Sequence, residues 1–587
     1  MDQLDENRSP ASIASDDFSS LVAGRIVPTS SPQATFFNWA RTFRCHPQKT
    51  FLPKTVYECR LITEWARREG KTLRAAGVGH SPSDLACTDE WMIRMDGMRR
   101  VLNVSENLQI GTWARELTKT SFQTDIENTT VTVEAGITLQ DLHEHLLEHG
   151  LALRNNGSIT EQTLAGIIAT ATHGSGFDFP VISGHVLELD LISSKEGAEI
   201  VHCSREENRD LFLATLCGLG MTGLIVSVKL DVEPAFRLRE SKVPVHMDYL
   251  LGTSAAEERI ARSSIAPGLQ DEKTPLLSRN ANEQVYEDPN FVAQRNLQSM
   301  QKIEDIAKSA EHVRMWWYPQ TGGVIVARAN RTYEASPFLA STNRRGMRAD
   351  NFYHAIQPPI KVWSLFGDFF HYHVTQFFLY LCTFVPRYTS WVGRWAWWLN
   401  ESPVVQQDHS YKVYTFDCLY PQYTTEWAIP MEKTRDVLAV LRDWLAEEEA
   451  DPRGQRVHFP IEIRFTAPDD VWLSPCYGRQ TTYIGIVQYK PYGKPVPYEK
   501  FFDKFSKIMA DHDGRPHWAK QHGFTAETLR ERYNKYDDFF EVVQAADPDG
   551  RWRCGYTQRH FGQQGAMPDG KRQISSEEGE RHMGVRD

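Results

Sequence analysis

Alternating hydrophobic and polar positions make the first half of the chain the easiest part to interpret. TVTVEA at 130–135 has the two-residue period of a strand. A helix is predicted after it, because Thr138 is placed to cap the first turn, leucines recur at three- and four-residue spacing, and Gly150 is suited to end it. Val186–Ser193 and Leu224–Val232 predict two more strands. Strands and helices do not alternate regularly, so we expect an α+β domain here.

The pattern changes in the middle of the chain. Residues 253–300 are polar and are interrupted by proline and glycine, which is typical of a long loop or insertion. Residues 335–350 have the same character. Between them, Glu311–Pro319 and Gly323–Asn330 are ordered hydrophobic segments. A chain of 587 residues is too long for one ordinary core, so we expect two or more domains.

Charge and cysteine usage exclude several classes of protein. The net charge of −11 argues against a nucleic-acid partner, which requires a surplus of Lys and Arg on one face. None of the nine cysteines forms a CxxC pair, which favours a reducing compartment and predicts neither a disulfide framework nor a metal site. The N-terminal residues are rich in Ser, Asp and Pro and contain no signal-peptide core, so a disordered tail is predicted there.

A strongly aromatic stretch covers Phe352–Leu399 and includes VWSLFGDFFHYHVTQFFLYLCTFVP at 362–386. Its polar residues, among them Asp368 and Gln376, argue against a membrane-spanning helix. Two interpretations stay open. The segment is either a helix in the membrane interface with a tryptophan-rich flank, or a buried helix of a globular domain.

The first segment whose residues are suited to binding a ligand is RAAGVGHSPSDL at 74–85. Its two glycines bring backbone N–H groups close together, and Ser81 and Ser83 add hydroxyl donors, which suits a pyrophosphate. His80 lies inside this loop. Taken alone, the loop is more typical of a tight turn with a hydrogen-bonded histidine.

A second segment, NNGSITEQTLAGIIATATHGSG at 155–176, consists mostly of small residues. Small residues allow a backbone to approach a flat ring or a phosphate closely, although a packed glycine-rich helix would have the same composition. GLGMTG at 218–223 matches the GxGxxG fingerprint of dinucleotide-binding folds. That fingerprint requires a strand before it and a helix after it, whereas the order predicted here is the reverse. We therefore predict no Rossmann site.

Two short segments in the second half add charged groups. In PIEIRF at 460–465, a strand would place Glu462 and Arg464 on one side and the hydrophobic residues on the other. Such a pair is commonly a solvated surface pair. In PHWAK at 516–520, His517 and Lys520 would share a face if the turn were helical.

Together these segments resemble the aldonolactone oxidoreductases of the vanillyl-alcohol-oxidase-type flavoprotein superfamily, in particular the D-arabinono-1,4-lactone oxidases. The resemblance covers most of residues 36–560. The matching segments are GVGHSPSDLACTD (77–89), GSITEQTLAGIIATATHGSG (157–176), GLGMTG (218–223), EWAIP (426–430), PIEIR (460–464) and HWAK (517–520).

The resemblance implies an α+β fold with a bipartite FAD-binding domain and an α+β cap domain. The expected division is a disordered tail at 1–35, an FAD-binding domain at 46–235, a cap domain at 236–510 with insertions near 253–300 and 335–405, a C-terminal segment at 511–560 that packs at the flavin, and a disordered tail at 561–587.

The resemblance also implies that FAD is bound covalently through His80. The other residues expected to bind FAD are Ala76, Gly77, Val78, Gly79, Ser81, Ser83, Gly157, Ser158, Ile159, Thr163, Gly166, Ala169, Thr170, Thr172, His173, Gly174, Gly220, Gly223 and Ile225.

By the same resemblance, Glu462, Arg464, Lys520 and His517 are the expected catalytic residues. The implied reaction oxidises the hydroxyl-bearing carbon beside a lactone carbonyl, and gives an ascorbate-type enediol lactone such as D-erythroascorbate. Gly157, the small residue before Ser158, favours O₂ as the electron acceptor, with H₂O₂ as product. Membership of this family further implies an intracellular location at a mitochondrial membrane, with peripheral contact through 362–398.

Two alternatives stay open. The first is another oxidoreductase of the superfamily, acting on an alditol, a hexose, or L-gulono- or L-galactono-1,4-lactone. The second is a membrane-associated carbohydrate-binding protein without catalysis, against which the joint presence of His80, Glu462, Arg464 and Lys520 argues.

Overall fold

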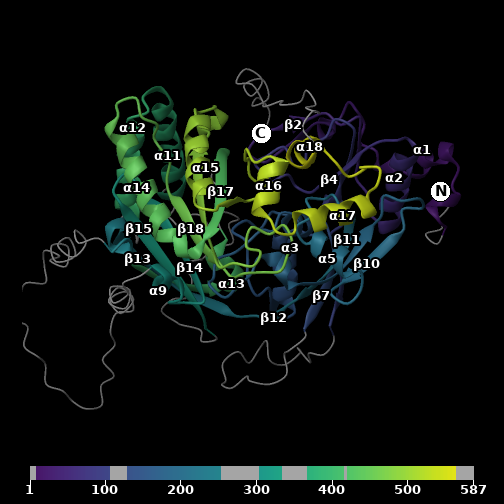
Figure 1. Cartoon of the computed structure of the whole chain (residues 1–587), viewed down its shortest axis with the longest axis horizontal. Helices are drawn as coiled ribbons and strands as arrows, with labels where there is room; N and C mark the ends of the chain where they lie inside the picture. Colours follow the sequence, from purple (N-terminus) through teal and green to yellow (C-terminus); the bar gives the residue numbers. More distant parts are fainter. Residues whose placement is uncertain (1–7, 106–128, 253–302, 333–366, 416–419, 563–587) are drawn as a thin grey trace, which may run out of the picture.

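The computed structural model describes residues 8–105, 129–252, 303–332, 367–415 and 420–562. They form two lobes that lie side by side (Figure 1). The N-terminal lobe contains the strands up to Pro234 and also the last helices of the chain, whereas the cap lobe contains the long strands between them.

The N-terminal lobe contains two main sheets. A parallel sheet has the strand order β3-β5-β4, and an antiparallel sheet has the order β10-β9-β11-β7-β6. The strands are β3 (Lys49–Phe51), β4 (Leu73–Ala76), β5 (Trp91–Arg94), β6 (Val101–Val104), β7 (Thr130–Glu134), β9 (Val186–Ile192), β10 (Ile200–Ser204) and β11 (Leu224–Asp231). The main helices are α2 (Val56–Arg68), α3 (Leu139–Glu148), α4 (Leu164–Ala169) and α5 (Arg209–Thr215).

The cap lobe is built on one antiparallel sheet with the strand order β16-β13-β15-β14-β18-β19-β17-β20. The strands are β13 (Arg237–His246), β14 (His312–Tyr318), β15 (Gly323–Thr332), β16 (Val404–His409), β17 (Gln422–Pro430), β18 (Ile461–Thr466), β19 (Thr481–Tyr489) and β20 (Arg515–Pro516). Helices α14 (Thr434–Ala450) and α15 (Glu499–Asp511) pack on one face of it, against alternate residues such as Ile461, Ile463 and Phe465. The opposite face therefore carries Glu462 and Arg464.

The predicted elements of the N-terminal lobe are confirmed. Strand β7 covers 130–134, and the Thr138 side chain accepts a hydrogen bond from the backbone N–H of Asp141 at the start of α3. Gly150 follows α3 with a φ of +67°, the left-handed conformation that a glycine adopts easily. GLGMTG lies between a helix (α5) and a strand (β11), so the predicted order, and with it the rejection of a Rossmann site, is confirmed.

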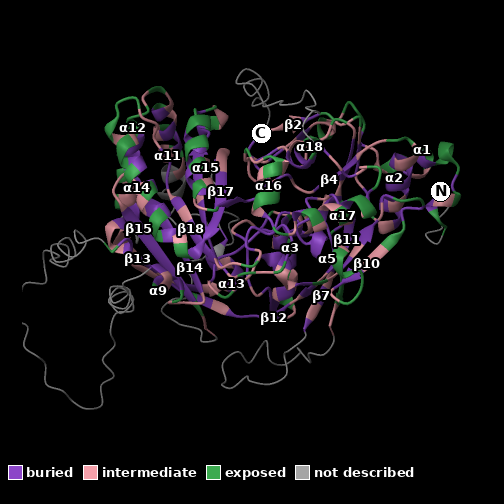
Figure 2. Ribbon diagram, viewed as in Figure 1, coloured by how far each residue is buried: buried purple, intermediate pink, exposed green. Residues whose placement is uncertain are grey.

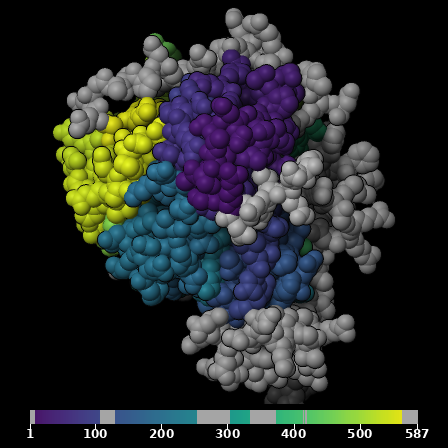
Figure 3. All heavy atoms as spheres, turned by 90° about the vertical axis from the view of Figure 1, so that its right-hand side faces the viewer, coloured from purple at the N-terminus to yellow at the C-terminus, as the bar shows by residue number. Residues whose placement is uncertain are grey.

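The N-terminal residues differ from the disordered tail predicted at 1–35. From Arg8 onward they are folded onto the N-terminal lobe, whose surface they cover in Figure 3. Phe18, in the short helix α1 (Phe18–Leu21), is completely buried with Ile13 and Val22 in a core that includes Trp65. The segment is polar overall, and its few hydrophobic residues become buried only through contacts with distant residues. Such contacts leave no local pattern in the sequence.

The last helices return to the N-terminal lobe. These are α16 (Ala526–Arg532), α17 (Tyr536–Ala546) and α18 (Gly555–Phe561), whose hydrophobic residues belong to the same core as β7, α3 and β11. In Figure 1 they lie across that lobe. The second predicted tail, at 561–587, lies outside the described part of the chain from residue 563 onward, whereas its first residue, Phe561, ends α18 and is buried. The predicted insertion at 253–300 and the loop-like residues 335–350 also lie outside the described part.

The aromatic stretch forms two helices of the cap lobe, α11 (Gly367–Phe384) and α12 (Tyr388–Asn400). Each buries one face, with Leu379, Cys382 and Val392 packed against Trp316 and Tyr318 of the sheet. The other faces are among the exposed regions of the cap lobe in Figure 2. Among the residues that the structure describes, no helix combines the length and hydrophobicity needed to cross a bilayer.

The buried position of Phe18 gives a first prediction. Phe18→Ala should lower the free energy of unfolding by about 3–5 kcal/mol, because it leaves a cavity in a fully buried site. Chemical denaturation, compared with Ser19→Ala at the exposed neighbouring position, measures the effect. Equal stability of the two variants would mean that this segment does not pack as described.

Candidate active site

A cavity of about 130 Å³ opens between the two small-residue segments of the N-terminal lobe. It brings together thirteen of the residues predicted to bind FAD: Ala76, Gly77, Val78, Gly79, His80, Ser81, Thr163, Gly166, Ala169, Thr170, Gly220, Gly223 and Ile225. They come from the end of β4, the start and end of α4, and the turn into β11. Residues separated by almost 150 positions thus line one cavity.

Two glycines shape the loop that follows β4. A Cβ atom on Gly77 would lie 2.2 Å from Thr163 Oγ1, so only glycine allows the two segments to approach this closely. Gly79 has a φ of +82°, and its carbonyl accepts a hydrogen bond of 2.8 Å from the backbone N–H of Trp39. Asn38 Nδ2 donates to the Ser81 carbonyl at 3.1 Å. The loop is therefore held between Thr163 on one side and the Asn38–Trp39 segment on the other.

His80 lies in this loop with its ring stacked on Trp39, at 5.8 Å between ring centroids. Its Nδ1 atom is buried and has no hydrogen-bond partner in the described part of the chain. Burial, together with the nearby positive charge of Lys520, lowers the pKa of His80 to about 4. The imidazole is therefore neutral at physiological pH, and its unprotonated nitrogen is a nucleophile.

Arg74 is a lining residue that the sequence analysis did not single out. It is the one residue with a permanent charge among the described residues that line the cavity. Its Nη1 atom donates to the Trp552 carbonyl at 3.3 Å, while its buried Nε has no partner. A buried guanidinium beside a glycine-lined loop is suited to a phosphate. The cavity residues thus fit the flavin nucleotide that the sequence predicts.

The remaining predicted FAD residues do not line the cavity. Ser83 Oγ donates to the carbonyl of Ala519 at 3.0 Å and so joins the His80 loop to the C-terminal segment. Ser158 Oγ accepts a hydrogen bond of 3.1 Å from Arg464, which joins the second segment to the cap lobe. Gly157, Ile159, Thr172, His173 and Gly174 belong to the same stretch of sequence, and His173 contacts Glu426 of the cap sheet.

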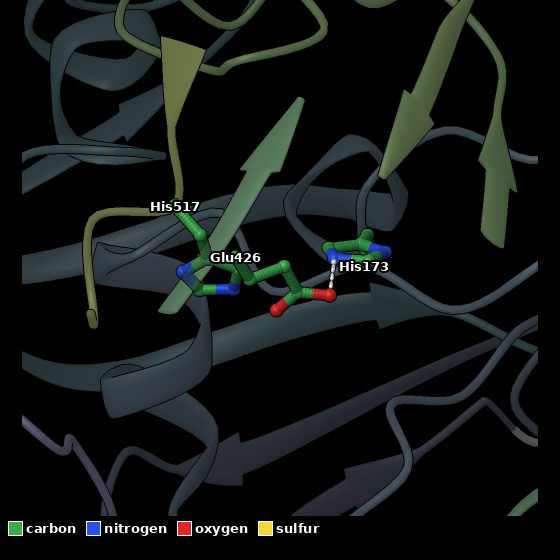
Figure 4. Close-up of side chains that lie close together, drawn as sticks. All are labelled: His173, Glu426 and His517. Atoms are coloured by element: carbon green, nitrogen blue, oxygen red, sulfur yellow. Dashed lines mark ion pairs between the residues drawn. The ribbon is translucent and has the colours of Figure 1, made fainter. Parts of the chain in front are cut away.

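Charged residues of the cap sheet and the C-terminal segment meet His173 of the N-terminal lobe on the site-facing side of the cap sheet. Arg464 on β18 lies 2.7 Å from Glu426 on β17 and 3.5 Å from Glu462. His173 Nε2 approaches the same Glu426 oxygen to 3.3 Å, as Figure 4 shows. Lys520 Nζ lies 3.8 Å from the other oxygen of Glu426. Three side chains therefore converge on the Glu426 carboxylate, and one of them, Arg464, also approaches Glu462.

The charges of this cluster are set by burial and by each other. Burial alone would raise the pKa of Glu426, but Arg464, His173 and Lys520 hold it well below its ordinary value. Burial lowers the pKa of His517 to about 3, and it also lowers the pKa of His173. The cluster thus contains two carboxylates, two cations and two neutral imidazoles.

The four predicted catalytic residues are brought together, with one difference in local structure. Glu462 and Arg464 share a strand face, as predicted. The HWAK segment is a turn after β20 rather than a helix, and the Lys520 N–H donates to the His517 carbonyl at 2.9 Å. His517 Nδ1 accepts the N–H of Ala519 at 3.1 Å. His517 therefore shapes the turn that carries Lys520.

Two residues of the cluster were not predicted. Glu426 opens the EWAIP segment that carried part of the family resemblance, which was the available signal. Tyr483 stacks on His173 at 3.4 Å between ring centroids, and its strand position is directly opposite Arg464. No local sequence pattern marks Tyr483, because its role depends on the register of β18 against β19.

Comparisons with known proteins agree with this geometry. Residues 290–560 match the family described as D-arabinono-1,4-lactone oxidase, and residues 47–204 match an FAD binding domain. The L-gulonolactone oxidase of Scyliorhinus torazame is 32% identical over 90% of this chain and 98% of its own length. The L-gulonolactone oxidase of Bos taurus is 31% identical over the same shares. The D-arabinono-1,4-lactone oxidase of Kluyveromyces lactis is 27% identical over 85% of this chain and 86% of its own length.

Solved structures share the fold at low sequence identity. A solvent-stable cholesterol oxidase has a TM-score of 0.66 and 16% identity, over 90% of this chain and 97% of its own. The cholesterol oxidase of B. sterolicum has a TM-score of 0.63 and 14% identity, over 91% of this chain and 99% of its own. These similarities confirm the predicted fold class of an FAD-binding domain with a cap. The identity to the L-gulonolactone oxidases over nearly their whole length shows that this chain belongs to the aldonolactone oxidoreductase family.

Proposed function

We propose that this protein is an FAD-dependent oxidase of sugar 1,4-lactones, acting on D-arabinono-1,4-lactone or a close aldonolactone. One observation carries the proposal: a cluster of two cations and two carboxylates adjoins the His80 cavity. Lys520 connects the two parts, because its neighbour Ala519 lines the cavity while the Lys520 Nζ lies 3.8 Å from Glu426. The relatives named as lactone oxidases support the substrate class.

FAD, when bound, accepts the hydride that leaves the substrate. We propose that His80 attaches it covalently, since the neutral imidazole has a buried Nδ1 without a partner. The glycines of the 77–79 loop and the Arg74 guanidinium would hold its phosphates. Attachment at His80 would fix the cofactor close to Lys520, whose charge acts on the His80 ring.

The residues of the cluster would act on the substrate hydroxyl beside the lactone carbonyl. Its oxidation removes a hydride from carbon and a proton from oxygen, and the keto-lactone formed tautomerises to an enediol. Arg464 and Lys520 would stabilise the negative charge that develops on that oxygen. Glu462 Oε1, which is buried without a partner, would accept a hydrogen bond from a substrate hydroxyl.

We propose O₂ as the electron acceptor, with H₂O₂ as its product. The support is Gly157, the smallest residue, at the position before Ser158 in the second small-residue segment. A Cβ atom there would lie only 3.1 Å from Thr172 Cγ2, so a larger residue would crowd this segment. The relatives named as oxidases also favour this acceptor.

Attachment through His80 gives a prediction for the purified protein. Acid precipitation should leave the flavin fluorescence in the pellet, because a covalent bond survives unfolding. With His80→Ala, the flavin should appear in the supernatant. His46→Ala, which replaces a histidine that does not line the cavity, is the matched control and should leave the flavin in the pellet. Release of flavin from the unmodified protein would refute the covalent bond.

The substrate class gives a second prediction. D-Arabinono-, L-gulono- or L-galactono-1,4-lactone should drive O₂ consumption with stoichiometric H₂O₂, and xylitol should be a poorer substrate. Arg464→Lys should lower kcat/KM by about 100-fold or more, because an ammonium cannot replace the guanidinium that bonds Glu426 and Ser158 together.

Arg435→Lys, at an exposed cap position, serves as control and should leave kcat/KM unchanged. Preference for xylitol over every lactone would identify an alditol oxidase instead. Reduction of cytochrome c without O₂ consumption would contradict the proposed acceptor.

We also propose that the α11–α12 hairpin makes peripheral contact with a membrane surface. Its outer side exposes 68% of Phe384 and 52% of Trp391, together with Leu381, Tyr388 and Trp398. Arg387 and Arg394 are exposed on the same hairpin and would attract anionic lipid headgroups. Association with a mitochondrial membrane stays a prediction of the family resemblance.

Sedimentation with phosphatidylcholine vesicles, with and without an anionic lipid, tests this contact. The protein should bind the anionic vesicles, and the double variant Phe384→Ser with Trp391→Ser should bind them at least tenfold more weakly. Ile200→Ser, which removes an exposed hydrophobic residue from β10 in the other lobe, should bind like the unmodified protein. Equal binding by all three proteins would exclude the hairpin as the contact.

A further inference from the structure

Glu426 occupies a special position in the cap sheet. It lies opposite Gly485 on β19, and Gly485 lies in turn opposite Glu462 on β18. A Cβ atom on Gly485 would already touch the Glu426 side chain at 3.6 Å. Since the middle strand has no side chain there, Arg464 can reach across it to Glu426.

The two carboxylates of the site have different surroundings. Both oxygens of Glu426 are engaged, one by Arg464 and His173 and the other by Lys520. Among the residues that the structure describes, Glu462 is approached by one cation, Arg464, at 3.5 Å through Oε2, and its buried Oε1 has no partner. Glu426 therefore holds both cations in place, whereas Glu462 has one oxygen available to accept a hydrogen bond from a bound substrate.

His173, Glu426 and His517 also have the composition of a metal site, with ligand atoms within 4.8 Å of one another (Figure 4). A divalent ion there would lie beside both Arg464 and Lys520, whose charges would repel it. It would also compete with Arg464 for the same carboxylate oxygen of Glu426. The geometry thus favours the carboxylate as a partner for cationic side chains rather than for a metal.

We infer that Glu426 is a positioning residue that holds Arg464 and Lys520 at the substrate and keeps Glu462 free to bind a substrate hydroxyl. This inference rests on the proposed function. The Glu426 carboxylate contacts side chains from three parts of the chain: Arg464 from the cap sheet, Lys520 from the C-terminal segment and His173 from the N-terminal lobe. Its backbone carbonyl also accepts the N–H of His517 at 3.0 Å, which fixes the turn that carries Lys520.

Removal of the Glu426 charge has two expected consequences. Arg464, without its shorter ion pair, would turn to Glu462, whose oxygens would then be lost to the substrate. The site would also gain one net positive charge, because two cations would face a single carboxylate. The first effect changes kcat and KM, and the second changes the affinity of the bound flavin for an anion.

The experiment compares Glu426→Gln, Glu426→Asp and the exposed control Glu432→Gln in the FAD-loaded enzyme. Sulfite adds to oxidised flavin as an anion, so its dissociation constant reports local charge without any turnover. Glu426→Gln should bind sulfite at least tenfold more tightly than the unmodified enzyme. Glu426→Asp keeps the charge and should stay within twofold of it, as should the control.

Lactone turnover then separates charge from position. Glu426→Gln should lower kcat by about 100-fold and raise KM, because Arg464 and Lys520 are no longer held in place and Arg464 forms an ion pair with Glu462 instead. Glu426→Asp should lower kcat at least tenfold despite its native charge, because the carboxylate is one methylene too far away. If the Gln variant fails to fold, the Asp variant carries the test.

The inference is overturned if Glu426→Asp has native kcat and KM, or if a folded Glu426→Gln variant binds sulfite like the unmodified enzyme. One equivalent of zinc in the purified enzyme, lost in Glu426→Gln, would also overturn it. These results are distinct from failure of the proposed function, in which the unmodified enzyme would oxidise no lactone but would still give a sulfite dissociation constant.

Discussion

The ion pair between Glu426 and Arg464 is the interaction on which the rest of the site depends. Both residues are buried, so neither charge could be accommodated without the other. The same carboxylate receives His173 from the N-terminal lobe and Lys520 from the C-terminal segment. The pair therefore also joins the two lobes through His173. The contacts of Glu426 thus hold together a site whose residues come from both lobes.

The fold explains how such a site can form from distant residues. The last helices belong to the core of the N-terminal lobe, so the chain passes from the cap back to the His80 loop, where Ser83 bonds to Ala519. Glycines let the His80 loop and the α4 segment approach each other, as the close contact of Gly77 with Thr163 illustrates. The cap sheet contributes charged side chains from one face and buries hydrophobic residues on the other.

Much of this arrangement could be predicted from the sequence, because its signals are local or carried by recognisable segments. The alternation in PIEIRF correctly predicts which residues of β18 face the site. Three features could not be predicted in this way. Phe18 is buried only through distant partners, Tyr483 acquires its place from strand register, and the HWAK turn is fixed by hydrogen bonds of His517 that no spacing rule encodes.

We propose that a sugar lactone donates its electrons to FAD bound beside this cluster. The most direct test mixes the purified protein with an excess of D-arabinono-1,4-lactone or L-gulono-1,4-lactone without oxygen and records the flavin absorbance near 450 nm. We predict that the absorbance bleaches, and that it returns when air is admitted. A flavin that dithionite bleaches, but that no lactone bleaches, would contradict the claim.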